Sequence, residues 1–130
     1  MNAPAAGERA QTGKMGENFT RRLLQEQGYS ICAVNFSSRY GEVDIIAQKD
    51  GMICFVEVKT RKSGSAVTGE QAVTPAKQKK LLRTAMLYLQ QFPTSAQMRF
   101  DVCSIRTDKN GAVLDYTYLT GAFDGEYYQS

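Results

Sequence analysis

The stretch Gly41–Arg61, GEVDIIAQKDGMICFVEVKTR, reads as two strands joined by a tight turn. Its first half alternates between apolar and polar residues, and Asp50-Gly51 is a strong signal for a two-residue hairpin loop. The second half is then the returning strand. A plain strand pair needs no charge in its middle, yet the apolar residues are interrupted by Asp44, Glu57 and Lys59.

The length of the loop sets the register of this hairpin. Counting outward from a two-residue loop, Asp44 lies opposite Glu57, and Glu42 lies opposite Lys59. Directly opposed residues share a face, with side chains roughly 5 Å apart, so two carboxylates placed in this way repel each other. A divalent cation is one compensator, because Mg²⁺ is usually held by one or two carboxylates together with water and phosphate oxygens.

The same charges also fit the solvated side of an ordinary hairpin, with Lys59 paired to Glu42 or Glu57. Surface ion pairs of this kind are common and contribute little stability. Against this interpretation, charges on a largely apolar face need a partner, and the face in question also carries Ile46, Ile53 and Phe55. Spacing alone leaves both interpretations open and favours the site modestly.

Hydrophobic spacing and turn residues predict the rest of the order. The predicted elements are a helix over 14–27, strands over 29–36, 42–49 and 52–60, a helix over 75–91, and strands over 98–105 and 114–119. Residues 62–73 are predicted to form a loop. The order is typical of an α/β domain in which one helix crosses between strands. Turn signals at Asp50-Gly51 and Asn110-Gly111 imply two antiparallel pairs, so the sheet is expected to be mixed.

The composition excludes several kinds of catalytic and metal site. The 130 residues fit a single domain, and the net charge of +3 is compatible with a phosphate-bearing partner without identifying one. The chain has no histidine, which excludes histidine-based catalysis and histidine-ligated zinc. The three cysteines form no C-x-x-C pair and have apolar neighbours, so we expect reduced, buried thiols rather than disulfides at Cys32, Cys54 and Cys103.

The N-terminal residues and the overall hydropathy predict location. Residues 1–13 lack an apolar segment and are expected to be a flexible tail ahead of a domain at 14–130. No run of apolar residues is long enough to span a bilayer. We therefore expect a cytoplasmic protein with no membrane partner.

The hairpin motif resembles the core of the PD-(D/E)xK nuclease superfamily, which has an acid on one strand and acid-x-lysine on the next. Asp44 matches the first acid, and Glu57-Val58-Lys59 match the second motif, with Val43 where the superfamily name has proline. The chain is most similar to the bacterial YraN-like family, which resembles archaeal Holliday-junction resolvases. The likeness runs from Gly16-Glu17 to RFDV at 99–102. It implies a restriction-endonuclease-like αβββαβ core, in agreement with the predicted order.

The resemblance also implies roles for individual residues. Asp44 and Glu57 would bind Mg²⁺ or Mn²⁺ together with the carbonyl of Val58. Lys59 would orient the attacking water and stabilise charge on the phosphate. Glu17 matches a helical acid that completes the site in related resolvases, although an acid near the start of a helix is also favoured by the helix dipole alone.

The implied partner is DNA, recognised by its structure rather than its sequence. Contacts to its backbone phosphates are expected from Arg39, Arg61 and Lys77, although cations in a helical stretch such as 77–83 are usually a solvated face. Related resolvases imply a homodimer, because a junction offers two symmetric cuts. The function predicted from sequence is a metal-dependent endonuclease acting on DNA, including branched DNA. The alternatives are a non-catalytic nucleic-acid-binding module on the same fold and a small interaction protein.

Overall fold

The computed structural model describes residues 4–63 and 74–123, and side chains from residue 13 onward. The predicted loop at 62–73 therefore falls almost wholly outside the described residues. In chain order the elements are α1 (Pro4–Glu26), β1 (Ser30–Ser38), β2 (Gly41–Lys49), β3 (Met52–Lys62), α2 (Pro75–Gln91), β4 (Gln97–Thr107) and β5 (Val113–Phe123). This order confirms the predicted single small α/β domain with an αβββαβ-type core, to which β5 adds one more strand.

The five strands form one mixed sheet in the order β1-β2-β3-β4-β5. Only β3 and β4 are parallel, and α2 provides the crossover between them. The other neighbouring pairs are antiparallel, including both pairs that the turn signals predicted. The expectation of a mixed sheet is confirmed.

The turn between β2 and β3 has the backbone that its residues favour. Asp50 and Gly51 have φ angles of 50° and 78°, and positive φ at both central residues is the mark of a type I′ turn. Lys49 pairs with Met52 directly across this turn. The loop therefore contains two residues, as the register count assumed.

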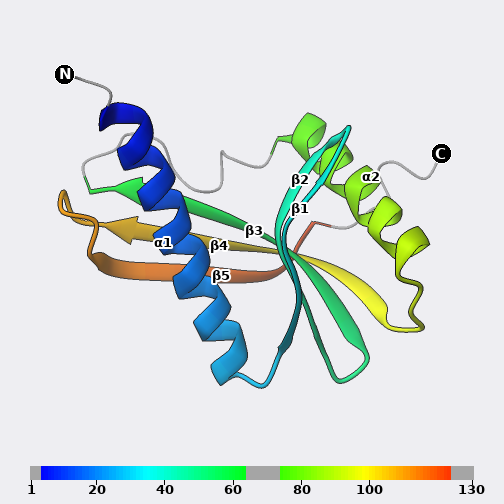
Figure 1. Cartoon of the computed structure of the whole chain (residues 1–130). Helices are drawn as coiled ribbons and strands as arrows, with labels where there is room; N and C mark the ends of the chain where they lie inside the picture. The colour runs from blue at the N-terminus through cyan, green and yellow to red at the C-terminus, as the bar shows by residue number, and fades with distance from the viewer. Residues whose placement is uncertain (1–3, 64–73, 124–130) are drawn as a thin grey trace.

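The two helices cover opposite faces of the sheet (Figure 1). Leu24 of α1 packs with Ile45, Val56 and Ile105 in one buried cluster. A second cluster joins α2 to the other face and contains Leu81, Ala85, Tyr88, Val43, Ile46, Ile53, Phe55 and Phe100. The face that carries Ile46, Ile53 and Phe55 is thus the buried face under α2, and Glu57 and Lys59 follow on that same side of β3.

The start of α2 is fixed by its sequence. The side chain of Thr74 accepts a hydrogen bond from the backbone N–H of Lys77, and Pro75 occupies the first helical position, where its missing N–H costs nothing. Lys77 therefore lies in the first turn of α2. The helix ends at Gln91, just before Pro93.

Two features differ from the sequence-based expectations. The first helix begins at Pro4 rather than near residue 14, and Pro4, Ala5 and Ala6 are residues that suit a helix start. Cys32 is exposed, whereas Cys54 and Cys103 are buried as expected. Cys32 lies at a bulge in the edge strand β1, where the pairing shifts between Ile31 and Ala33. The bulge exposes its side chain although the neighbouring residues are apolar.

Neither helix within the described ranges combines the length and the apolar character that a bilayer crossing requires.

Candidate metal centre

The hairpin ladder brings Asp44 to the amide of Val58. Paired residues run from Lys49–Met52 to Ile45–Val56, and the next step of this register is Asp44 against Glu57. The recorded pairing of β2 with β3 ends one step earlier, at Ile45–Val56, and Oδ2 of Asp44 accepts a hydrogen bond of 2.7 Å from the N–H of Val58. The carboxylate therefore replaces a strand partner. The predicted register is confirmed from Lys49–Met52 to Ile45–Val56, and Asp44 is anchored to the strand that carries Glu57.

Glu57 is a buried carboxylate with two ammonium partners. Its exposed fraction is only 5%. Its Oε2 lies 3.0 Å from Nζ of Lys59 and 2.6 Å from Nζ of Lys77. The expected Glu42–Lys59 pairing does not form: Glu42 instead accepts a hydrogen bond from Ser37 of β1. A solvated hairpin face does not describe this arrangement, because burying a carboxylate is costly unless it is paired.

The pKa values of the two carboxyl groups are shifted in opposite directions. Burial, and next the charge of Glu57, raise the pKa of Asp44 to about 7. Burial also acts to raise the pKa of Glu57, but hydrogen bonds from Lys77 and Asp44 and the charge of Lys59 outweigh it and hold that pKa below its usual value. As the pH falls, the pair therefore takes its first proton on Asp44, while Glu57 keeps its negative charge.

The pKa values of Lys59 and Lys77 are also shifted in opposite directions. Burial, followed by the neighbouring Lys77, lowers the pKa of Lys59. Burial acts in the same direction on Lys77, but the hydrogen bond to Glu57 outweighs it and raises its pKa. Lys77 is thus the principal counter-ion of Glu57. Lys59 is the more readily deprotonated of the two ammonium groups.

The donor set at this position fits a hard divalent cation. Asp44 and Glu57 supply carboxylate oxygens. The N–H and C=O of one residue point to the same side of a strand, so the carbonyl of Val58 faces the side on which Asp44 receives its N–H. Two carboxylates and a carbonyl are oxygen donors of the kind that Mg²⁺ and Mn²⁺ prefer. Within the described ranges no cluster of three or more His, Cys, Asp or Glu side chains is placed to hold a metal.

Glu17 lies on α1, and its hydrogen bond is to another element. Oε1 of Glu17 accepts a hydrogen bond of 3.1 Å from the side-chain amide of Asn35 in β1. In the part of the chain that the structure describes, Glu17 makes no hydrogen bond to Asp44 or Glu57. Its role as a further acid of the site stays a prediction.

The predicted DNA contacts are distributed around the site. Lys77 lies within it, in contact with Glu57. Arg39 lies in the turn between β1 and β2, where its guanidinium donates to the hydroxyl of Tyr40. Arg61 lies two residues beyond Lys59 on β3, beside Arg106 of β4. Of the three cations, Lys77 contacts a carboxylate of the site. Within the described residues, Arg39 and Arg61 form no ion pair with Asp44 or Glu57.

One polar cluster was not foreseen from the sequence. Asp101, in the RFDV segment, is 1% exposed and accepts two hydrogen bonds of 2.8 Å from Arg99. It also accepts from the hydroxyl of Tyr118 and the N–H of Gly121. All four donors end on one buried carboxylate, so this motif joins β4 to β5. The signal was the Arg-x-Asp spacing, which puts both side chains on one face of a strand.

The segment that holds these residues matches a family model. Residues 16–105 match the model described as "Uncharacterised protein family UPF0102". The matched range includes Asp44, Glu57, Lys59 and Lys77. The chain belongs to this family.

Relatives named UPF0102 protein match over most of their length. The protein from Dictyoglomus thermophilum is 41% identical over 112 residues, covering 85% of this chain and 95% of the relative. The protein from Myxococcus xanthus is 34% identical over 125 residues, or 95% and 98% of the two chains. One from a Synechococcus species is 42% identical over 120 residues, or 86% and 90%. The YraN-like family membership expected from the sequence is confirmed.

Proposed function

We propose that this chain is a metal-dependent endonuclease that hydrolyses phosphodiester bonds in DNA, including branched DNA. The observation that carries the proposal is the pairing of the partly buried Asp44 with the buried Glu57, with the ammonium of Lys59 3.0 Å from Glu57. Asp44 is held in place by the hydrogen bond from Val58, at the point where the pairing of β2 with β3 ends. A hairpin with a purely structural role does not need these charged residues. The Asp-x(12)-Glu-x-Lys spacing resembles the PD-(D/E)xK nucleases, and its geometry supports the same chemistry.

Each residue of the site has a distinct task in this proposal. Asp44, Glu57 and the carbonyl of Val58 hold Mg²⁺ or Mn²⁺. When bound, the ion supplies Lewis acidity and a water of lowered pKa. Lys59 remains half-buried beside Glu57, where its ammonium holds a phosphate oxygen and stabilises the charge that develops on it. Glu17 is retained as a further acid that would approach the site from α1.

The substrate is proposed to be bound through its backbone. Arg39, Arg61 and Lys77 contact phosphates, which position DNA without reading its sequence. Recognition is then selective for DNA structure. Two symmetric cuts in a junction need two copies of the site, so the active species is proposed to be a homodimer. Reduced cysteines fit a cytoplasmic enzyme.

One observation favours a second candidate, a nucleic-acid-binding module without catalysis. Nζ of Lys77 lies 2.6 Å from Oε2 of Glu57, so an internal cation already neutralises the carboxylate that would bind the ion. A site that permanently kept this pair would bind DNA through its cations and leave it uncut. The two candidates differ in whether a divalent ion displaces Lys77.

The test is a cleavage assay over linear, flapped, single-stranded and four-way DNA with Mg²⁺ or Mn²⁺. We expect cutting by the wild type, loss of cutting in Glu57→Gln and Lys59→Met, and normal cutting in the control Glu42→Gln, which alters an exposed carboxylate of β2. Salt-dependent binding without cutting would support the second candidate. Absence of binding even at low salt, where phosphate contacts are strongest, would leave a small interaction protein.

A further inference from the structure

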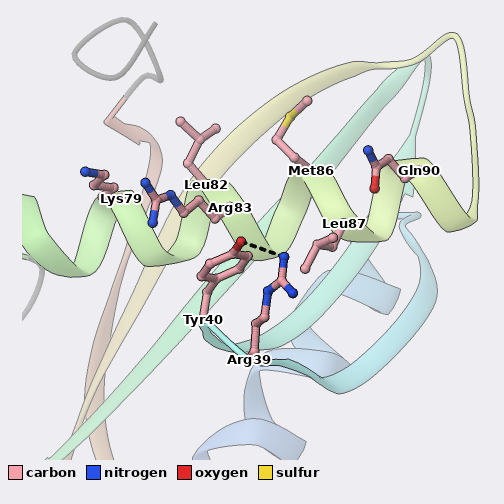
Figure 2. A pocket seen from close by; sticks show the side chains of 8 residues that line it. All are labelled: Arg39, Tyr40, Lys79, Leu82, Arg83, Met86, Leu87 and Gln90. Carbon is pink, nitrogen blue, oxygen red and sulfur yellow. Dashed lines mark hydrogen bonds between the residues drawn. The ribbon is translucent and has the colours of Figure 1, made fainter.

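A pocket outside the carboxylate site lies between α2 and the turn that joins β1 to β2 (Figure 2). Its volume is about 590 Å³, within the usual range for ligand pockets. The turn contributes Arg39 and Tyr40, and α2 contributes Lys79, Arg83, Met86, Gln90 and two leucines. We refer to it as the Tyr40 pocket.

The charge of the Tyr40 pocket is entirely positive. Arg39, Lys79 and Arg83 are all exposed, and no carboxylate is among the residues that line the pocket. None of the three cations forms an ion pair with any residue in the described ranges. Three cations without counter-ions around one hollow raise the local concentration of anions.

The aromatic ring of Tyr40 organises two of these cations. The guanidinium carbon of Arg39 lies 5.0 Å from the centre of the ring, and that of Arg83 lies 5.3 Å from it. Arg39 also donates a hydrogen bond of 3.0 Å to the hydroxyl of Tyr40. Figure 2 shows the ring between the two guanidinium groups. Both planar groups are therefore held in place before any ligand arrives, and a guanidinium can bind a phosphate or stack on a base.

The remaining walls suit the rest of a nucleotide. Two leucines and Met86, which is 49% exposed, give an apolar surface against which a flat base can pack. The amide of Gln90 offers both a donor and an acceptor at the end of the same helix face. An inorganic anion would use only the cations. A nucleotide would use the cations, the apolar wall and the amide together.

The Tyr40 pocket lies close to the carboxylate site along both elements. Tyr40 and Asp44 are four residue steps apart on extended chain, about 13 Å. Lys77 and Arg83 are six residue steps apart on α2, about 9 Å along the helix axis. At the duplex spacing of roughly 3.4 Å per nucleotide these spans correspond to about three or four steps, and an extended unpaired strand needs fewer. A strand bound at the carboxylates can therefore reach the pocket within a few nucleotides.

We propose that the Tyr40 pocket binds one nucleotide of an unpaired DNA strand that continues to or from the carboxylate site. A paired base must be unpaired and unstacked before it can enter, whereas an unpaired base enters at a smaller cost. The pocket thereby makes binding selective for flapped or single-stranded DNA over blunt duplex. This inference rests on the proposed function in one respect, that the ligand is DNA.

The test measures binding rather than cutting, in EDTA, with a labelled single strand, a flapped duplex and a blunt duplex. The double variant Arg39→Gln/Arg83→Gln is expected to bind the single strand at least tenfold more weakly than the wild type. Its salt dependence should fall by about 1.4 in slope, for two lost phosphate contacts. The charge-matched control is Arg22→Gln/Lys109→Gln, two exposed cations on α1 and in the β4–β5 turn. It should stay within about twofold of the wild type at moderate salt.

A second variant separates the contribution of the planar guanidinium of Arg83 from the contribution of its charge. Arg83→Lys keeps the positive charge but loses the planar group beside Tyr40, so single-strand affinity should fall severalfold while the salt slope stays near that of the wild type. Equal losses in the pocket variant and the charge-matched control would overturn the inference. So would wild-type binding that is equally tight to the blunt duplex and the single strand.

Failure of the pocket and failure of the nuclease proposal are distinguishable. Glu57→Gln should lose cutting but keep its preference for the single strand. If the wild type cuts DNA and the pocket variant binds like its control, only the pocket inference falls. If single-strand binding depends on Arg39 and Arg83 but no divalent ion supports cutting, only the proposed nuclease activity falls.

Discussion

Nζ of Lys77, in the first turn of α2, lies 2.6 Å from Oε2 of Glu57 on β3. Glu57 is almost fully buried, whereas the side chain of Lys77 is 36% exposed, so water reaches this ion pair from the lysine side. A divalent ion bound by Glu57 needs the same carboxylate oxygens. At the proposed metal site, Lys77 and the ion would therefore compete for one ligand, and the strength of this competition would set the metal affinity.

Replacing Lys77 with methionine removes the competing cation and keeps a side chain of similar length. We expect Mn²⁺ and Mg²⁺ to bind Lys77→Met about tenfold more tightly than the wild type, corresponding to about 1.4 kcal/mol. Titration calorimetry with the metal alone measures this directly. Lys80→Met, an exposed change one turn along the same helix, should leave the affinity unchanged. Weaker binding by Lys77→Met would show that Lys77 helps to form the metal site instead of competing for it.

The stability of the metal-free protein should depend on the protonation of Asp44. Its pKa of about 7 lies above the ordinary value of 3.8, so the folded state holds a proton that the unfolded chain has lost between these values. The free energy of unfolding should therefore fall as pH rises through this window, by on the order of 2–4 kcal/mol, and then level off. Glu57 affects the stability in a lower pH range. Its pKa is lowered in the folded state, so the stability that it adds is lost only when the pH falls below the ordinary pKa of a glutamate. Urea denaturation in EDTA across the window measures the slope.

Asp44→Asn tests the source of this slope. The amide oxygen can still accept the hydrogen bond from Val58, but the side chain cannot ionise. The variant should show no loss of stability between about pH 5 and 8, and should be more stable than the wild type at the upper end. Glu42→Gln, an exposed change on the same strand, should keep the wild-type slope. A variant that is less stable than the wild type at the upper end would contradict this account.

The fold and the carboxylate pair could be predicted because their signals are local. The Asp50-Gly51 dipeptide sets the turn, and the turn sets which residues oppose each other. Alternation along the two strands then puts Asp44 and Glu57 on one face, the face that also carries the apolar residues Ile46, Ile53 and Phe55. Each step depends on neighbours in the sequence, so no knowledge of the tertiary structure was needed.

Other features depend on how distant elements meet, and the sequence alone did not reveal them. The contact between Lys77 and Glu57 requires the placement of α2 over β3, so Lys77 was assigned only to DNA. Cys32 was expected in the core because its neighbours are apolar, but the bulge in the edge strand exposes it. Glu17 was expected to act with the carboxylates; its hydrogen bond from Asn35 could not be read from the sequence, and its role at the site stays a prediction.

Gly16 should be intolerant of any side chain. A Cβ at this position would lie 2.2 Å from Oγ1 of Thr60, because α1 packs directly on β3 here. Threonine has few rotamers available, so the contact is not easily relieved. Gly16→Ala should therefore destabilise the protein by about 1–3 kcal/mol in urea denaturation.

The neighbouring Gly13 provides the matched control for this change. Nothing lies within 4 Å of a Cβ built there, so Gly13→Ala should stabilise the helix by about 0.5–1 kcal/mol. Adding Thr60→Ala to Gly16→Ala should recover part of the loss, since the clashing atom is then absent. Additive losses in the double variant would show that the close approach at Thr60 is not the cause.

Asp101 should matter for stability far more than an exposed acid in a similar ion pair. Its two oxygens accept from Arg99, Tyr118 and the backbone of Gly121, and an asparagine would replace one of these acceptors with a donor. Asp101→Asn should therefore cost about 2–4 kcal/mol in the free energy of unfolding. Asp115, which pairs with Arg106 in full contact with water, is the control, and Asp115→Asn should cause no measurable loss. If both substitutions had equal effects, the buried carboxylate would not be what joins β4 to β5, and the strands would be held by their backbone pairing and apolar contacts alone.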